Sequence, residues 1–281
     1  MKQRMKIANN DILKFDTLKF DRSGLKAFSV KTLTCATLAM SSSLVFAESF
    51  TFDRLGESLG TATVPKGHVA WEQSLPSASY DEWRVDGEQN SQLTLQADAL
   101  VRIGVADDLE VRVGWDGPVW QRNKDGADDH DIDGTGDVTI GVKKAIETND
   151  ERMSWAVLAQ VNLANGDDEF TEEDEIYSVA SAISYDYSDN ITTGITMKYD
   201  YQDGDLAWSA IPNIGYGITK NVSGFSEFVY RKQESEHYES MVNTGLIWML
   251  NDRLQLDAML GYSFNEQNPR YRAGLGFAYL F

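Results

Sequence analysis

A run of aspartates between residues 125 and 137 has the spacing of a metal-binding loop. It reads Asp-Gly-Ala-Asp-Asp-His-Asp-Ile-Asp-Gly-Thr-Gly-Asp, so Asp129, Asp131 and Asp133 alternate just before a glycine. Alternate oxygen ligands ahead of a glycine open the calcium loop of an EF-hand, but the twelfth position, which needs a bidentate Glu, is Ile140. The run therefore predicts a solvated acidic loop, and loose binding of calcium or magnesium at the surface is the alternative. We expect no other cofactor.

The residue types of nucleophilic catalysis are present but are not arranged to react. A serine hydrolase such as a phospholipase needs a serine hydroxyl within hydrogen-bond reach of a histidine that a third group orients. The histidines are His68, His130 and His237, and two of them fall in predicted loops. No serine pairs with a histidine on adjacent predicted strands, and the sequence has no phosphate-binding glycine loop or zinc spacing. The sequence therefore predicts that the protein is not an enzyme.

Charged residues recur at every second position of several segments whose other positions are apolar. Because alternate side chains of a strand face the same side, we expect these charges to line one interior. The predicted set is Glu72, Asp98, Arg102, Glu110, Arg112, Asp137, Lys143, Lys198, Asp200, Glu227, Arg231, Asp257 and Arg272. Unpaired charge in a narrow interior is costly, so the mixed signs indicate pairing across it. Arg102, Arg112 and Lys143 lie on three successive segments and are expected to form one basic patch.

The elements that position these charges are strands. From residue 67 to the end, segments of roughly nine to twelve residues alternate apolar with polar or small side chains, the pattern of a strand with one apolar face. The predicted strands are 67–75, 92–103, 109–116, 137–147, 152–163, 175–187, 191–202, 207–218, 222–232, 240–250, 254–264 and 270–281. In 254–264, for example, Leu254 and Leu256 lie on the face opposite Asp257.

The connections between these strands alternate in length. Short turns, such as 106–108 and 251–253, lie at one end of the strands, and longer polar connections lie at the other. The predicted longer loops are 76–91, 117–136, 164–174, 203–206, 233–239 and 265–269. Twelve antiparallel strands whose chain ends lie together need this alternation. In bacterial barrels of this kind the short turns are periplasmic and the longer loops extracellular.

The pattern is typical of an up-and-down antiparallel β-barrel that spans a membrane. No run of about 18 or more apolar residues is present, which excludes a helical span, whereas barrel strands need only alternate residues to face lipid. Aromatic residues gather at both predicted strand ends, for example Tyr201 and Tyr262 at the outer end and Trp248 and Tyr279 at the periplasmic end. Such rings are expected where headgroups meet hydrocarbon. A soluble β-sandwich, the alternative, would not require them.

The first 47 residues predict a cleaved export signal. Lys31 precedes a run of apolar and small residues that ends at Ala47, and Glu48 follows. A basic flank, a short apolar centre and a small residue at the break are the parts of a secretory signal, and a buried core helix is the alternative. The one cysteine, Cys35, lies within this signal, so we expect no disulfide in the mature chain.

The last predicted strand carries aromatic residues on its apolar face up to its final position. Phe277, Tyr279 and Phe281 alternate with Ala278 and Leu280. This resembles the terminal strand that the outer-membrane assembly machinery recognises. We therefore expect the three aromatic residues to act as an assembly signal.

Two stretches resemble one family in particular. They are Val101-Arg102-Ile103-Gly104-Val105-Ala106-Asp107-Asp108-Leu109-Glu110-Val111-Arg112-Val113-Gly114 and Gly134-Thr135-Gly136-Asp137-Val138-Thr139-Ile140-Gly141-Val142-Lys143. The first resembles a hairpin, and the second the Gly-x-Gly-Asp start of a strand, in the MetA-pathway phenol-degradation family of predicted outer-membrane transporters. The order and spacing of strands over 60–281 also fit. The resemblance implies passage of small molecules of an aromatic or hydrophobic kind.

These features predict three parts: a leader and signal peptide at 1–47, a periplasmic N-terminal segment at 48–66 and a transmembrane barrel at 67–281. We expect the barrel in the outer membrane of a Gram-negative bacterium, in contact with lipid and lipopolysaccharide and assembled by the barrel-assembly machinery. The net charge of −19 argues against a nucleic-acid partner, because phosphates are bound by basic surfaces. The expected function is passive passage of a small-molecule solute. The alternative is a structural or surface-interaction protein whose lumen is closed by interlocked side chains.

Overall fold

The computed structural model describes residues 50–281 except 86, 127, 235 and 265–268. The predicted signal at 1–47 lies outside the described residues. Within them, fifteen strands form one sheet of antiparallel neighbours. None of the described residues belongs to a helix long and apolar enough to cross a membrane.

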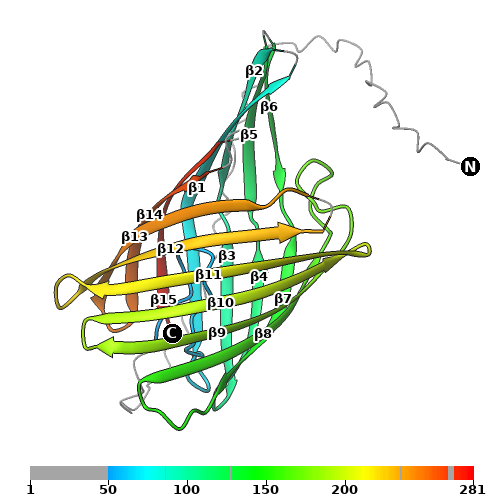
Figure 1. The fold of residues 1–281 in the computed structure, drawn as a ribbon. Coiled ribbons are helices and arrows are strands. Elements are labelled where there is room, and N and C mark those ends of the chain that lie inside the picture. Colours follow the sequence, from blue (N-terminus) through cyan, green and yellow to red (C-terminus); the bar gives the residue numbers. More distant parts are fainter. Residues whose placement is uncertain (1–49, 86, 127, 235, 265–268) are drawn as a thin grey trace, which may run out of the picture. The chain divides into compact units, whose positions relative to one another are not determined.

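Twelve of the described strands close into a barrel (Figure 1). They follow the order β1, β3, β4 and β7 to β15, and β15 pairs again with β1. Their bounds are β1 (Val69–Val85), β3 (Ala99–Ala106), β4 (Leu109–Trp115), β7 (Val138–Ile146), β8 (Met153–Leu163), β9 (Ile176–Ser188), β10 (Ile191–Gln202), β11 (Asp205–Gly217), β12 (Val222–Gln233), β13 (Glu239–Asn251), β14 (Leu254–Ser263) and β15 (Arg270–Leu280). The predicted twelve-stranded antiparallel up-and-down barrel is confirmed.

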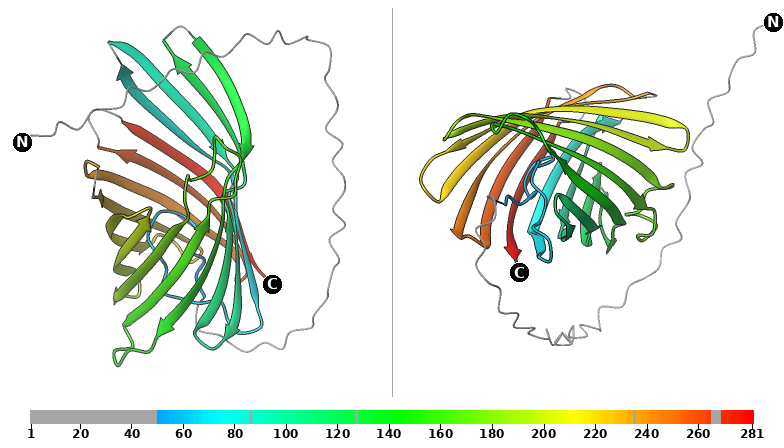
Figure 2. Two further views of the ribbon diagram at one scale, coloured as in Figure 1. Left: turned by 90° about the vertical axis from the view of Figure 1, so that its right-hand side faces the viewer. Right: turned by 90° about the horizontal axis from the view of Figure 1, so that it is seen from below.

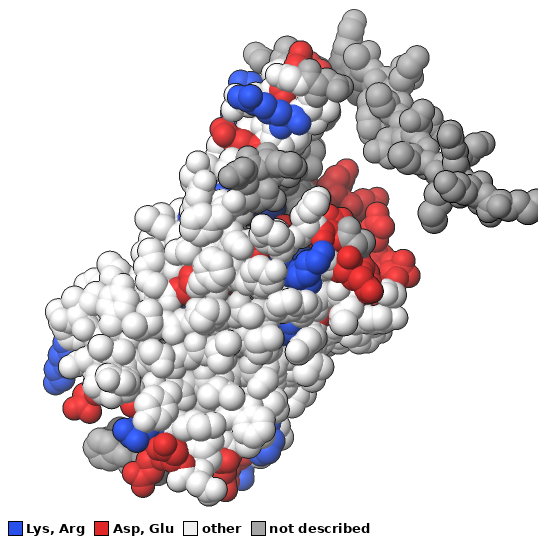
Figure 3. Space-filling view, in the orientation of Figure 1, with Lys and Arg blue, Asp and Glu red and all other residues white. Residues whose placement is uncertain are grey.

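Alternation along each strand decides which side chains face the interior. In β14, Asp257 is 6% exposed and Leu260 is 64% exposed. In β10, Asp200 is buried, while Tyr199 and Tyr201 on either side of it are exposed. Buried charge and exposed apolar surface reverse the arrangement of a soluble protein and suit a barrel with lipid outside and water inside. Figure 3 shows a broad band with few charged residues between the charged ends.

Aromatic side chains cluster at both ends of the barrel strands. At the loop end, the ring of Tyr262 lies 5.2 Å from that of Tyr271 and 5.4 Å from that of Phe264. At the turn end, the rings of Tyr279 and Phe281 are 4.7 Å apart. Two aromatic levels match the two headgroup regions of a bilayer.

Three strands outside the ring extend the sheet beyond the loop end of the barrel (Figure 1). They are β2 (Glu88–Gln96), β5 (Pro118–Asp125) and β6 (Asp128–Thr135). The first part of β1 pairs with β3, and its second part, from Ser77 onward, pairs with β2. The sheet then continues from β2 to β5 and β6.

The extension corrects three sequence predictions. Residues 76–91 and 117–136 were expected as loops, but they form most of the extension, and the predicted strand 92–103 is divided between β2 and β3. The physical reason is that much of the extension has polar or charged residues on both faces. Strands in water need no apolar face toward lipid. The alternation of apolar and polar residues that identifies the barrel strands is therefore weak in the extension.

Residues 50–67, called the N-terminal segment below, lie inside the barrel. The blue trace of this segment runs within the ring of strands in both views of Figure 2. It turns back at Leu55 and Gly56, whose φ angles are 83° and 81°, and leads into β1. Near the turn end its Phe52 and Val64 pack against the inward-facing Ala70 and Ala278. The prediction of a periplasmic segment at 48–66 was wrong for the described part, because the charged side chains of this segment pair with residues of the inner wall.

Candidate functional site

Three basic residues of the inner wall converge on one carboxylate of the N-terminal segment. Asp53 Oδ2 lies 2.9 Å from Lys143 Nζ and 2.8 Å from Arg112 Nη1, and Asp53 Oδ1 lies 3.5 Å from Arg102 Nη1. The cations come from the adjacent strands β3, β4 and β7. The structure therefore brings the expected basic patch together, around an acid that the sequence analysis did not single out.

Arg102 connects this group to two further carboxylates. Its Nε and Nη2 donate to the two oxygens of Glu110 at 2.8 and 2.9 Å, and its Nη1 donates to Glu72 at 2.9 Å. A guanidinium can bind a carboxylate through two parallel hydrogen bonds, so both charges are satisfied although both side chains are buried. The residues of this group, called the Asp53 cluster below, are Asp53, Glu72, Arg102, Glu110, Arg112 and Lys143.

Arg54 contacts the neighbouring part of the wall, formed by β14, β15 and β1. Its Nε donates to Asp257 at 3.1 Å on β14, and its Nη2 donates to the carbonyl of Leu275 at 3.3 Å on β15. On the β1 side, Nη1 bonds to Ser74 at 3.4 Å and lies 3.7 Å from Asp98. Asp98 also accepts a hydrogen bond from the Ser74 hydroxyl.

The tip of the N-terminal segment is bound through its backbone. Glu227 accepts the N–H groups of Glu57 at 2.6 Å and Ser58 at 3.0 Å, and Asn243 Nδ2 donates to it at 2.8 Å. Successive backbone N–H groups that converge in this way form a small anion-binding nest. A Cβ on Gly56 would lie 2.6 Å from Glu227 Oε1, so a glycine is needed at this turn. Arg272, on β15, pairs with Glu57 at 2.5 Å.

The returning half of the N-terminal segment is held by the wall near the turn end. Val64 N donates to Glu110 at 2.7 Å, and the carbonyl of Ala62 accepts a hydrogen bond from Arg102 at 2.9 Å. A Cβ on the inward-facing Gly104 would lie 2.2 Å from the carbonyl oxygen of Pro65. The wall therefore leaves room for this backbone. The segment therefore occupies the part of the lumen nearest the turn end.

A hollow of about 580 Å³ remains on the outer side of the N-terminal segment. We call it the vestibule. Its wall carries Lys198 and Asp200 on β10, whose charged groups lie 3.1 Å apart, and Arg231 on β12. Glu57 and Ser58 of the tip form part of its floor. The vestibule is thus a mixed polar and apolar space within the barrel wall.

Two acids lie at the outer rim, and one of them, Asp137, belongs to the predicted inward set. Asp137 accepts the backbone N–H groups of Asn165, Gly166 and Glu172 at 2.8, 2.7 and 3.0 Å, which fixes the loop after β8. Asp116, in the connection after β4, faces like charges. Burial, followed by the charges of Asp137, Asp98 and Glu172, raises its pKa to about 6.

The aspartates of the proposed cation loop lie on β6, in the extension. Asp129 pairs with Arg122 of β5, whose Nε also lies 3.9 Å from Asp131, and all these side chains are exposed. Alternate residues of a strand are separated by roughly 6.6 Å along its axis, so Asp129, Asp131 and Asp133 do not fold around one point. Within the described residues no group of three or more His, Cys, Asp or Glu residues has the geometry of a metal site. Loose cation binding at this hairpin stays a prediction.

The histidines are dispersed. His68 Nδ1 lies 2.7 Å from the carbonyl oxygen of Phe281, while His130 and His237 are exposed outside the barrel. Within the described part of the chain none of them is hydrogen-bonded to a serine hydroxyl.

In β15, Phe277 and Tyr279 pair in register with Gln73 and Trp71 of β1, so the expected assembly residues lie at the closure of the barrel.

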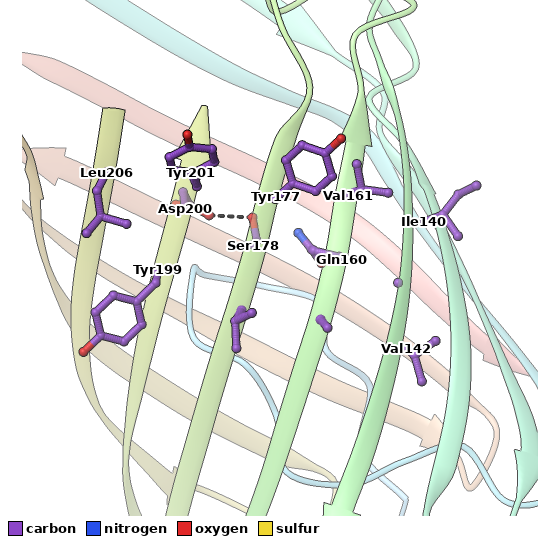
Figure 4. Close-up of a pocket in the computed structure, with 13 residues that line it drawn as sticks. Ile140, Val142, Gln160, Val161, Tyr177, Ser178, Tyr199, Asp200, Tyr201 and Leu206 are labelled. Carbon is purple, nitrogen blue, oxygen red and sulfur yellow. Dashed lines mark hydrogen bonds between the residues drawn. The ribbon is translucent and has the colours of Figure 1, made fainter. Parts of the chain in front are cut away.

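The lipid-facing side of the wall next to the vestibule is also hollowed. Figure 4 shows Tyr177, Tyr199 and Tyr201 on the outer side of β9 and β10, around a depression of about 570 Å³. Ser178 and Asp200 lie between this depression and the lumen and share a hydrogen bond of 2.5 Å. The pairing of β9 with β10 is continuous from Thr192 onward, so the wall has no opening at this point.

A closed ring of twelve strands, an apolar exterior and a charged interior together define a transmembrane β-barrel of the outer-membrane type. Within this class the chain belongs to the family described as Putative MetA-pathway of phenol degradation, whose model matches residues 52–281. The resemblance inferred from residues 101–114 and 134–143 is therefore confirmed. No curated protein matches the sequence.

Solved structures share this fold at low sequence identity. An outer-membrane channel from Pseudomonas putida F1 is 11% identical, with a TM-score of 0.58 over 81% of this chain and 100% of that chain. The translocator domain of the autotransporter NalP from Neisseria meningitidis is 9% identical, with a TM-score of 0.54 over 76% of this chain and 88% of that chain. The chain accordingly shares the fold of these outer-membrane barrels.

Proposed function

We propose that the protein is a passive channel for small molecules, in which the N-terminal segment closes the lumen and must move for solute to pass. The observation that carries this proposal is how the segment is attached. Within the described residues, the backbone of residues 50–64 forms no backbone-to-backbone hydrogen bond with the barrel. Side chains hold it instead, so it can leave without breaking the strand pairing that keeps the barrel closed.

Two further observations support a channel. The vestibule already leads from the outer rim to the tip of the segment. The family description, phenol degradation, is in keeping with solutes of an aromatic or hydrophobic kind. Lipopolysaccharide and the barrel-assembly machinery stay predicted partners of the exterior and of the terminal strand.

The second candidate is a structural or surface-interaction protein whose lumen never opens. The burial of the Asp53 cluster favours it, because Arg102, Glu110 and Lys143 are fully enclosed and paired. Breaking one partner of a buried pair typically costs about 3–5 kcal/mol. The two candidates therefore differ in whether the segment is released on the timescale of transport.

Conductance in a planar bilayer tests the channel directly. We expect brief, infrequent steps from the mature protein and larger, long-lived steps from a variant that lacks residues 50–64. The barrel of the variant must first be shown to be folded by its heat-modifiable migration. A folded variant that conducts no ions would overturn the channel and favour the closed structural protein. A wild-type protein that conducts as much as the variant would contradict closure by the segment.

A further inference from the structure

The vestibule contains one cation that no carboxylate neutralises at close range. Arg112, Arg270, Arg272 and Lys198 also line this hollow, and each pairs with an acid. Among the described residues, no carboxylate lies within 4.0 Å of the Arg231 guanidinium, which donates a hydrogen bond to the side-chain oxygen of Gln233 at 3.3 Å. Arg231 therefore keeps donors available toward the hollow.

A second cation lies two strands away, since Lys198 pairs in register with Ser209 of β11 and Ser209 pairs with Arg231. Lys198, on β10, lines the same hollow, and its side chain is 37% exposed. Its partner Asp200 also accepts a hydrogen bond from Ser178 at 2.5 Å, so that carboxylate is shared between two donors. Arg231 and Lys198 also both line a smaller hollow of about 200 Å³ that adjoins the vestibule wall. The two cations thus face one accessible space.

Apolar side chains line the vestibule beside these charges. Val229 and Met241 come from β12 and β13, and Leu59 comes from the tip of the N-terminal segment. The volume of about 580 Å³ lies within the range of pockets that enclose small organic molecules. A cation beside an apolar wall recognises a molecule with one charged and one apolar end.

Two acids oppose this assignment: Glu57 of the floor, which interacts electrostatically with both Arg231 and Lys198, and Glu239, which also offers a way to test it. Glu239 lines the vestibule, and its Cα pairs in register with that of Arg231 between β12 and β13. Opposed residues of two strands have their Cβ atoms about 5 Å apart, so Glu239 competes for the guanidinium. An anionic solute must displace this competitor.

We propose that the vestibule binds a small amphipathic organic anion, whose carboxylate is held by Arg231 and Lys198 and whose apolar body lies against Leu59, Val229 and Met241. This assignment rests on the proposed function and names the class of its solute. The anion would be the solute that binds on the outer side of the N-terminal segment before passage. A guanidinium fits a carboxylate through two parallel hydrogen bonds, and an ammonium adds a further charged donor.

Ligand-observed NMR of the purified mature protein in detergent tests the site without requiring conductance. The probe is benzoate, with benzyl alcohol as its neutral counterpart and acetate as the anion without an apolar body. We expect benzoate to bind more tightly than either. Arg231→Gln should weaken benzoate binding about tenfold, which is the usual effect of losing one charge-assisted hydrogen bond. Glu239→Gln should strengthen it, because the competing carboxylate is gone.

Arg122→Gln is the matched control, since it makes the same chemical change on the exposed hairpin and should leave benzoate binding unchanged. Equal binding of benzyl alcohol, or of acetate, would overturn the proposal. So would unchanged affinity in both folded vestibule variants. Opposite shifts for Arg231→Gln and Glu239→Gln would support it, because a merely structural role predicts no such pair. Benzoate binding by a protein that never conducts would refute the channel and leave the site standing, whereas conductance without benzoate binding would do the reverse.

Discussion

Replacing Asp53 by Asn removes the charge at the centre of the Asp53 cluster and nearly preserves the shape of the side chain. Asp53 is 4% exposed and lies within 3.5 Å of three cations. After the change, Lys143 and Arg112 lose their closest acid, and Glu110 stays as the nearest carboxylate, at 4.0 and 3.9 Å. The N-terminal segment then loses its strongest electrostatic attachment to the wall.

The magnitude follows from the burial of the group. Removing one partner of a buried ion pair costs about 3–5 kcal/mol. Asp53 also borders the vestibule, where water can partly solvate the orphaned cations, so we expect the lower end of that range. At about 1.4 kcal/mol for each factor of ten, about 3 kcal/mol raises the population of the released segment roughly a hundredfold.

Hydrogen exchange followed by mass spectrometry measures this release. The backbone N–H groups of Leu59 and Val64 donate to Thr196 and Glu110, so they exchange when the segment leaves the wall. We expect exchange in a peptide that covers 50–64 to quicken about a hundredfold in the Asp53→Asn variant, with the barrel strands unaffected. Asp129→Asn removes an exposed pair in the extension and should change nothing in this peptide. Exchange that is unchanged within a factor of three would refute the idea that the Asp53 cluster holds the segment.

Three further changes test other parts of the structure. Gly276→Val places a side chain where Arg54 lies, since a Cβ there would be 2.2 Å from its Nε, and we expect faster exchange in residues 50–64. Phe281→Asp puts a charge at the lipid-facing end of the closing seam, and the amount of heat-modifiable barrel in membranes should fall sharply while synthesis continues. Asp116→Asn tests the acidic rim. The pKa of Asp116 is raised in the folded protein from 3.8 to about 6, so its favourable contribution is present below pH 4 and is lost as the pH rises through 6. Urea unfolding at pH 4 and at pH 7.5 should therefore show Asp116→Asn gaining about 1–2 kcal/mol over wild type only at the higher pH, because partial exposure reduces the roughly 3 kcal/mol that two pKa units imply.

The barrel was predictable because lipid imposes a local rule on its strands. Leu254, Leu256 and Leu260 must face hydrocarbon while Asp257 faces the lumen, and this alternation is visible in the sequence of a single strand. The strands of the extension were not predicted, because strands surrounded by water do not need this alternation of apolar and polar residues. Residues such as Gln92 on β2 and Asn123 on β5 bond to each other at 3.0 Å, yet neither shows a pattern along its own strand.

The N-terminal segment escaped prediction for a different reason. Its partners lie far along the chain, as Arg54 and Asp257 are 203 residues apart, and no local pattern encodes such a contact. A weak signal was nevertheless present. Gly104 and Gly276 occupy inward positions of barrel strands, where the absence of a side chain makes room for another part of the protein.

Arg54 has a consequence for the lifetime of an open channel. It contacts β1 through Ser74 and the last two strands through Asp257 and the carbonyl of Leu275, so it bridges the line along which the barrel closes. The pairing of β1 with β15 shifts register between Ser74 and Ser77, close to this bridge. In the proposed opening, the N-terminal segment leaves and the seam loses the contacts of Arg54 just as the lumen fills with water. Under this proposal permeability and mechanical integrity are opposed, and each opening favours a prompt return of the segment.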